Sequence, residues 1–172
     1  MNTSARELID LHDLHQLKYR YVRSVDTQNF DLMGTCFTAH ARAWFAGGAF
    51  TFDGREKIIG FLRQLITPSF VSSHIVMHPE LKITGPGTAE GIWRMQDTVY
   101  FTAANPIYAH ANLIGGDRLT GSAYYHDEYV KEADGWKMRS IGFIRIFEVI
   151  ERKQARRGID LKIEASRGMQ GQ

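Results

Sequence analysis

Two histidines lie four positions apart in the segment SSHIVMHPEL, residues 72–81. A His-x-x-x-His pair binds zinc when it lies on a helix, because residues i and i+4 then share one face. Here Ile75 follows His74 where a metalloprotease has a glutamate, and the β-branched residues with Pro79 predict a strand. On a strand, four residues separate the side chains by roughly 13 Å, whereas two ligands of one metal approach to roughly 4 Å. The spacing excludes a metal shared with His78, and no metal site is predicted.

The two histidines therefore have separate roles. Alternation places His74 and His78 on the same face of the strand unless a bulge forms near Pro79. We interpret His78, next to the proline, as a packing or rim histidine. His74 is the candidate catalytic base, provided that a carboxylate lies beside it.

Two charged residues share strand faces with large apolar side chains. Asp97 does so in IWRMQDTVYF, and Arg145 shares its face with Ile141, Phe143, Phe147 and Val149 in the last strand. Because burial of a lone charge costs several kcal/mol, the sequence predicts an ion pair between Asp97 and Arg145 inside the sheet. The alternative is that both line a cavity and bind a substrate. Arg139 is a second candidate for the pocket arginine.

Asp26 lies where the first predicted helix ends, on the edge of its apolar stripe. A solvated or capping carboxylate is the simpler interpretation, since Asp is common near helix ends. Tyr21 precedes it by five residues, a rotation of about 140°. The two side chains can meet in one cavity only if a sheet wraps around that end of the helix.

The periodicity predicts the elements that must position these residues. Apolar residues at steps of three or four predict an amphipathic helix over residues 4–28, followed by a short helix over 29–37. The segment ARAWFAGGAFTFDG predicts a strand pair with a Gly-Gly turn. Asp53 and Glu56 have the pattern of a capping box that opens a third helix.

After Pro68 the apolar pattern changes from helical to alternating. Four long strands are predicted by SFVSSHIVMHPELKI, AEGIWRMQDTVYFTA, LTGSAYYHDEYVKE and GWKMRSIGFIRIFEVI. Helices followed by antiparallel strands indicate an α+β fold with a curved sheet wrapped against the helices. The connection over residues 105–118 is long enough to form a lid or rim loop.

The composition indicates one globular domain. A chain of 172 residues with 44% hydrophobic and 23% charged residues is typical of a single domain, which we assign to residues 1–150. Residues 151–172 form a charged tail that is not a separate domain, and we expect it to be partly disordered or to pack on a partner subunit. The single cysteine, Cys36, is interpreted as a core residue.

The charge pattern and hydropathy bound the possible partners. The net charge is only +2 and no Lys/Arg block interleaves with aromatic residues, so we expect no nucleic-acid partner. No stretch approaches the roughly 18 to 20 apolar residues of a membrane span, and the N-terminus has no apolar leader region. The protein is expected to be cytoplasmic, with no membrane partner.

Four segments resemble the SnoaL-like branch of the NTF2-like superfamily, which includes scytalone dehydratase and bile acid 7α-dehydratase relatives. They are YRYVRSVDTQNFDLMGTCF, GREKIIGFL, SSHIVMHPELKI and GWKMRSIGFIRIFE. The resemblance extends from about Leu8 to Val149. It implies a cone-shaped fold in which N-terminal helices pack in a strongly curved mixed or antiparallel sheet that encloses a hydrophobic pocket. It also implies that five residues converge in that pocket: Tyr21, Asp26, His74, Asp97 and Arg145.

The resemblance implies a function for this constellation. Asp26 would accept a hydrogen bond from one His74 ring nitrogen while the other takes a proton, which makes His74 a general base. Tyr21 could donate to a carbonyl or a departing hydroxyl, and Arg145, held by Asp97, could stabilise an enolate. We therefore expect a cofactor-independent lyase or isomerase of the dehydratase type. Two alternatives remain open: a ligand-binding module without catalysis, and a small structural subunit of a ring-hydroxylating dioxygenase.

The expected ligand is a hydrophobic cyclic small molecule that is steroid-like, polyketide-like or aromatic. The substrate-binding residues that we predict are Asp97, Arg145, Trp44, Phe61, Trp93 and Phe143. No cofactor is expected, because the sequence has no glycine-rich dinucleotide fingerprint.

Self-association into a dimer or trimer is also expected, since such a fold leaves a broad sheet face open. The third and fourth long strands are predicted to place four residues on or near that surface: Tyr124, His126, Trp136 and Met138.

Overall fold

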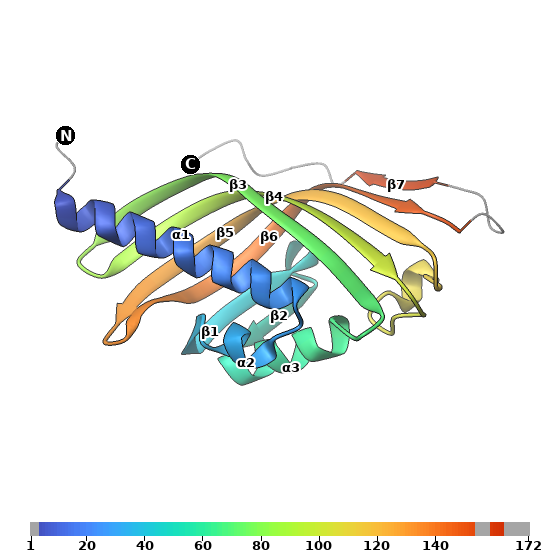
Figure 1. The fold of residues 1–172 in the computed structure, drawn as a ribbon, viewed down its shortest axis with the longest axis horizontal. Coiled ribbons are helices and arrows are strands. Elements are labelled where there is room, and N and C mark those ends of the chain that lie inside the picture. Colours follow the sequence, from blue (N-terminus) through green and yellow to red (C-terminus); the bar gives the residue numbers. More distant parts are fainter. Residues whose placement is uncertain (1–3, 154–158, 164–172) are drawn as a thin grey trace.

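The computed structural model describes residues 4–153 and 159–163, and Figure 1 shows their arrangement. The three helices are α1 (Ala5–Asp26), α2 (Phe30–Gly34) and α3 (Arg55–Leu65). Two shorter strands precede α3, namely β1 (Phe37–Phe45) and β2 (Phe50–Asp53). The four long strands are β3 (Phe70–Gly85), β4 (Thr88–Phe101), β5 (Arg118–Glu132) and β6 (Gly135–Glu151), and β7 spans Ile159–Ile163. The predicted helices and long strands are therefore confirmed.

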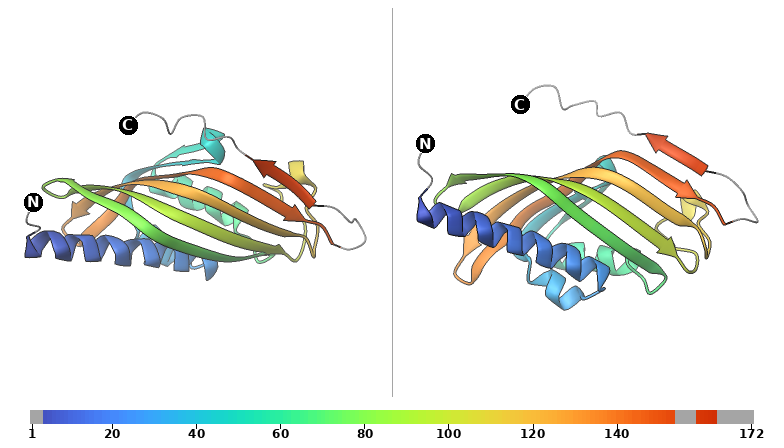
Figure 2. Two further views of the ribbon diagram at one scale, coloured as in Figure 1. Left: turned by 90° about the horizontal axis from the view of Figure 1, so that it is seen from above. Right: turned by 45° about the horizontal axis from the view of Figure 1, so that its top comes forward.

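The strands form one curved sheet in the order β2-β1-β6-β5-β4-β3, with β7 added to β6. β1 runs parallel to β6, and the other pairs are antiparallel, so the sheet is mixed. α1 lies along the inner face of the sheet, and α2 and α3 lie near β1 and β2 (Figures 1 and 2). This arrangement is the α+β fold that the sequence predicts.

α1 begins and ends as its sequence suggests. The Ser4 hydroxyl accepts a hydrogen bond from the Glu7 backbone N–H at 3.2 Å, as an N-cap should. The apolar stripe of the helix is buried and includes Leu14, Leu17 and Tyr21. The helix ends at Asp26, directly beside β3. None of the described helices combines the length and hydropathy that crossing a bilayer requires.

The start of α3 differs from the predicted capping box. Its N-cap is Gly54, which has φ +99° and provides no side-chain cap. The Asp53 carboxylate instead accepts a hydrogen bond from Arg42 Nε at 2.8 Å, across the β1–β2 pair. The prediction of a capping box formed by Asp53 and Glu56 is therefore wrong, because the Asp53 carboxylate is bound by a cation on the neighbouring strand.

A β-bulge interrupts β3 where the sequence places Pro79. The register shifts between Met77 and Glu80, and His78 has φ +48°. Before the bulge the even-numbered residues of β3 face inward, and after it the odd-numbered residues do. His74 therefore faces the inside of the sheet, whereas His78 is exposed.

Two further bulges shape β6. Successive residues of β5 pair first with Ser140 and then with Met138, and elsewhere first with Phe147 and then with Arg145. Arg139 and Ile146 therefore have no partner residue on β5, and each is the extra residue of a bulge. The first bulge turns Trp136 and Met138 inward.

The prediction that Trp136 and Met138 lie on an exposed surface is therefore wrong. Their exposed fractions are only 5% and 0%. The Trp136 indole donates to Asp10 Oδ1 at 3.0 Å. Tyr124 and His126 are half-buried.

Part of the charged tail is ordered. Residues Ile159–Ile163 form β7, which pairs with Phe147–Glu151 of β6 in antiparallel register. The edge of β6 offers backbone groups that β7 binds, and the expectation that the tail is partly disordered or packs on a partner subunit stays a prediction. Residues 154–158 and 164–172 lie outside the described part of the chain.

Candidate active site

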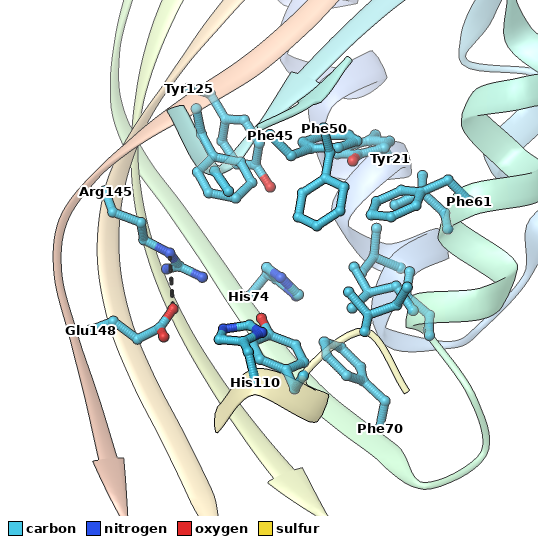
Figure 3. Close-up of a pocket in the computed structure, with 18 residues that line it drawn as sticks. Tyr21, Phe45, Phe50, Phe61, Phe70, His74, His110, Tyr125, Arg145 and Glu148 are labelled. Atoms are coloured by element: carbon cyan, nitrogen blue, oxygen red, sulfur yellow. Dashed lines mark ion pairs between the residues drawn. The ribbon is translucent and has the colours of Figure 1, made fainter. Parts of the chain in front are cut away.

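A cavity of about 160 Å³ lies between the inner face of the sheet, α1 and α3. Figure 3 shows that its lining side chains come from helices, strands and the loop before β5. One group is aromatic and apolar: Phe45, Phe50, Phe61, Phe70 and Phe143. The polar group consists of Tyr21, His74, Tyr108, His110, Tyr125, Arg145 and Glu148. Aromatic and polar side chains therefore share the wall of the cavity.

Asp26 and His74 form a hydrogen-bonded pair at this cavity. His74 Nδ1 lies 2.6 Å from Asp26 Oδ1, and the His74 backbone N–H donates to Asp26 Oδ2 at 2.9 Å. The Ser72 hydroxyl also donates to Asp26 Oδ1, at 2.8 Å. With Nδ1–H donated to the carboxylate, Nε2 of the neutral ring is left as the acceptor nitrogen.

The surroundings keep Asp26 ionised. Burial acts to raise its pKa, but the hydrogen bonds from His74 and Ser72 outweigh burial and hold the pKa below its ordinary value. A carboxylate in this position fixes the tautomer and the orientation of the imidazole. It also stabilises the imidazolium that forms when Nε2 takes a proton.

The chain positions the pair through the end of α1 and the beginning of β3. Ser72 and His74 are two residues apart on a strand, so their side chains share the inner face. Gln28, two residues after α1, donates from Nε2 to the backbone carbonyls of Thr67 and Phe70, both at 3.1 Å. These bonds attach the helix end to the start of β3 and thereby fix Asp26.

Arg145 and Asp97 form the predicted ion pair. Arg145 Nη1 donates to Asp97 Oδ1 at 2.5 Å, and Nη2 donates to Oδ2 at 2.6 Å. Arg145 Nε also lies 3.7 Å from Glu148 Oε2. Arg145 lines the cavity, whereas Asp97 lies behind it and does not. The alternative candidate Arg139 is exposed and binds Glu128 at 2.9 Å.

A glycine makes room for this ion pair. Gly121 lies directly opposite Asp97 on β5. A Cβ atom at Gly121 would lie 2.3 Å from Arg145 Nη1 and 2.8 Å from Asp97 Oδ1. The guanidinium therefore occupies the space that any side chain at this position would need.

Tyr21 and Tyr125 bring two phenols to the cavity. Both are buried, with their rings edge to face at 6.4 Å between centroids. Burial raises the pKa of both phenols, so both are neutral hydrogen-bond donors at neutral pH. The wrapped sheet meets the condition under which Tyr21 and Asp26 can approach one cavity.

Besides Asp97, two predicted substrate-binding residues do not line the cavity, namely Trp44 and Trp93. Trp44 packs over Gly142, where a Cβ atom would lie 1.9 Å from the Trp44 ring, and it faces His126. Trp93 is fully buried, and its indole donates to the Tyr129 hydroxyl at 2.8 Å. Phe61 and Phe143, in contrast, line the cavity.

Four polar lining residues were not predicted from the sequence. Tyr108 and His110 lie in an irregular segment, so no periodicity indicates their direction. Tyr125 lies on the same face of β5 as its buried neighbours, so the alternation along this strand could have indicated that Tyr125 faces inward. Glu148 faces inward only because the bulge at Ile146 reverses the alternation of β6.

The same bulge corrects the face that we predicted for β6. Phe147 and Val149 pair with Ser122 and Thr120, so they point away from the face that carries Arg145.

Among the described residues, no group of three or more His, Cys, Asp and Glu side chains is close enough to hold a metal ion.

A mixed sheet curved around helices, with a pocket that joins aromatic and polar residues, defines the NTF2-like cone fold. The SnoaL-like domain matches residues 6–141, and the chain therefore belongs to the SnoaL-like family.

Solved structures share this fold over most of their length. A hexachlorocyclohexane dehydrochlorinase of type 2 is similar with a TM-score of 0.71 and 14% identity, over 84% of this chain and 90% of that protein. A candidate scytalone dehydratase of Novosphingobium aromaticivorans gives 0.71 and 15%, over 86% and 91%. A candidate aromatic ring hydroxylase of the same species gives 0.70 and 16%, over 90% and 94%.

Proposed function

We propose that the protein is a cofactor-independent lyase or isomerase of the dehydratase type that acts on a hydrophobic cyclic small molecule. The observation that carries the proposal is the Asp26–His74 hydrogen bond at the edge of an aromatic cavity. A carboxylate that binds one imidazole nitrogen leaves the other nitrogen basic, and general base catalysis of this kind contributes roughly 10²- to 10⁴-fold in rate.

In the proposed reaction, His74 Nε2 removes a proton from a carbon next to a carbonyl group. The C–H electron pair forms an enolate, whose oxygen accepts hydrogen bonds from Tyr21 or Arg145. The enolate then collapses to form a C=C bond, and the neighbouring C–O bond breaks. The departing hydroxyl takes back the proton from the imidazolium and leaves as water, which returns His74 to its neutral form.

The polar groups are suited to these roles. Tyr21 remains a neutral donor, because burial raises its pKa. Arg145 is held in place by Asp97 and lines the cavity. Fixed donors of this kind stabilise a developing oxyanion without having to reorganise during the reaction.

The aromatic side chains of the cavity favour a ligand with a flat ring system. Phe61 stacks against Phe45 with centroids 5.9 Å apart and against Phe52 at 4.6 Å. Such walls bury apolar rings with little loss of side-chain entropy. Two of the similar structures, the dehydrochlorinase and the candidate scytalone dehydratase, are named for elimination reactions, which supports the same reaction class here.

The experiment that tests the proposal begins with mass spectrometry of small molecules that co-purify with the protein. These compounds, and a panel of cyclic β-hydroxyketones, are then incubated with the protein in D2O. A base that works as proposed incorporates deuterium next to the carbonyl or gives a product lighter by one water. Recovery of every compound unaltered, with clear binding, would instead indicate a ligand-binding module.

A second candidate function is a small structural subunit of a ring-hydroxylating dioxygenase. The similarity to the candidate aromatic ring hydroxylase favours it. Affinity purification of the tagged protein from its native cells discriminates between the two functions. A stoichiometric iron-containing large subunit would support this second candidate.

A further inference from the structure

Arg145 is the only arginine or lysine among the described residues that line the cavity. An arginine in an apolar pocket commonly binds a carboxylate or phosphate group of a ligand, since its planar fork matches the geometry of such anions. The contacts of Arg145 point to a different role here.

The guanidinium is already bound by a carboxylate of the protein. Both terminal nitrogens donate to Asp97, at 2.5 and 2.6 Å, in a bidentate pair. The two side chains are only 9% and 4% exposed, so water does not screen the pair. Gly121 allows this close approach, because a larger residue would collide with both groups. The positive charge is therefore neutralised before a ligand arrives.

Two more carboxylates lie at or behind the cavity wall. Glu148 lines it and lies 3.7 Å from Arg145 Nε, and Asp26 binds His74 from behind. The charges of Glu148 and Asp97 act on Tyr108: burial raises the pKa of its phenol, these two carboxylates raise the pKa further, and Arg145 lowers it. The Asp97-bound Arg145 can therefore donate a hydrogen bond, as the proposed enolate step requires, but it has no net positive charge with which to bind a ligand carboxylate.

We infer that the pocket selects uncharged ring compounds and rejects their carboxylates, although an arginine lines it. This inference rests on the proposed function, because it defines the ligand of the same site. A ligand carboxylate would lose its hydration and meet like charges, which costs several kcal/mol in comparable interfaces. An uncharged carbonyl or hydroxyl oxygen can still accept an N–H from the Asp97-bound guanidinium.

The test compares two probes that share one ring system, naphthylmethanol and naphthoate. Titration calorimetry at neutral pH gives the dissociation constant of each probe for the wild-type protein. We expect naphthoate to bind at least about tenfold more weakly than naphthylmethanol. An equal or tighter affinity for naphthoate would overturn the inference.

Variants locate the cause of the discrimination. Asp97→Asn removes the charge that neutralises Arg145, so the ratio of the two dissociation constants should fall by about tenfold or more. Glu148→Gln keeps the Asp97–Arg145 pair and should shift the ratio in the same direction, which provides a test even if Asp97→Asn does not fold. The control is Glu128→Gln, which makes the same change beside the exposed Arg139 and should leave the ratio unchanged.

The failure of the inference and that of the proposed function give different results. If the ratio of the two dissociation constants stays unchanged in both Asp97→Asn and Glu148→Gln, these charges do not cause the discrimination and the inference is overturned. The hydrophobic ring site would still stand. Failure of both probes to bind any of the proteins contradicts the hydrophobic ring site itself, and the inference with it.

Discussion

His74 and Asp26, 48 positions apart in the chain, are joined by two hydrogen bonds, one from the imidazole Nδ1 at 2.6 Å and one from the backbone N–H at 2.9 Å. The backbone bond anchors the carboxylate to the strand that carries the imidazole. The Asp26 carboxylate is therefore held by the backbone of the same residue whose ring it orients. A base held in this way loses little entropy when it approaches a substrate.

Removal of either member of the pair should abolish most of the activity. Once a substrate is in hand, we expect His74→Ala and Asp26→Asn each to lower kcat by roughly 10²- to 10⁴-fold, because a general base or its orienting carboxylate is lost. Steady-state kinetics measure the effect. His78→Ala is the matched control, since His78 is exposed within the bulge and its replacement should leave nearly full activity. Equal losses in His74→Ala and His78→Ala would contradict the assignment.

Asp26 should also make stability depend on pH. Its pKa in the folded protein is lowered, so the unfolded chain binds the proton more tightly and the carboxylate stabilises the fold above the ordinary carboxyl pKa. This stabilisation is lost as the pH falls through the folded-state pKa. Urea unfolding from about pH 7 to about pH 3 should therefore show the free-energy difference between wild type and Asp26→Asn shrinking towards acid. A difference that is constant or grows towards acid would show that the carboxylate is not held as described.

Gly121→Ala should disrupt the Asp97–Arg145 pair. The new methyl group would lie 2.3 Å from Arg145 Nη1, so the guanidinium must move and leave a buried charge poorly compensated. We expect a loss of roughly 3 to 5 kcal/mol in the free energy of unfolding, measured by urea denaturation. Gly60→Ala in α3 is the control, because a Cβ there meets nothing within 4 Å and the substitution should be neutral or slightly stabilising.

A second buried ion pair, which packs against Tyr21 and Tyr125 from behind the cavity wall, allows a similar test. Lys18 is fully buried, and its Nζ lies 2.7 Å from Asp127 Oδ2, which also accepts a hydrogen bond from Tyr129. Lys18→Met should cost roughly 3 to 5 kcal/mol, because it leaves the Asp127 charge buried without its cation.

The double variant Lys18→Met with Asp127→Leu should recover part of the stability lost in Lys18→Met. Removing both charges avoids the cost of one buried charge without a partner. Urea unfolding of the single and double variants gives the comparison. A double variant that is less stable than Lys18→Met would show that the unpaired Asp127 carboxylate is not the cause of the loss in Lys18→Met.

The helices and the long strands could be predicted because their apolar residues repeat locally, at steps of three to four or of two. The pairing of β1 with β6 could not, since these strands are about a hundred residues apart and no local pattern records their parallel contact. The ion pair of Asp97 with Arg145 was predictable from the cost of burying a lone charge. Trp44 and Trp93 show the limit of this reasoning, because a large aromatic residue fills a core or a sheet surface as readily as a pocket.

Bulges account for the remaining errors. One extra residue at Arg139 turned Trp136 and Met138 inward, and another at Ile146 turned Glu148 inward. Strict alternation predicts the opposite direction after each of them. A bulge depends on backbone torsions and on the neighbouring strand, so the order of apolar and polar residues does not reveal it.

The bulge at Ile146 also suggests how pockets of this family could diversify. If the bulge closed with Ile146 kept in the strand, Ile146 would pair with Ser122, and Phe147 would replace Glu148 in the wall of the cavity. The charge beside Arg145 would then be exchanged for an aromatic ring without a substitution at either position, with the Asp26–His74 pair untouched. A change in the register of one strand, and not only substitutions in the cavity wall, would thus offer an evolutionary route from one substrate to another.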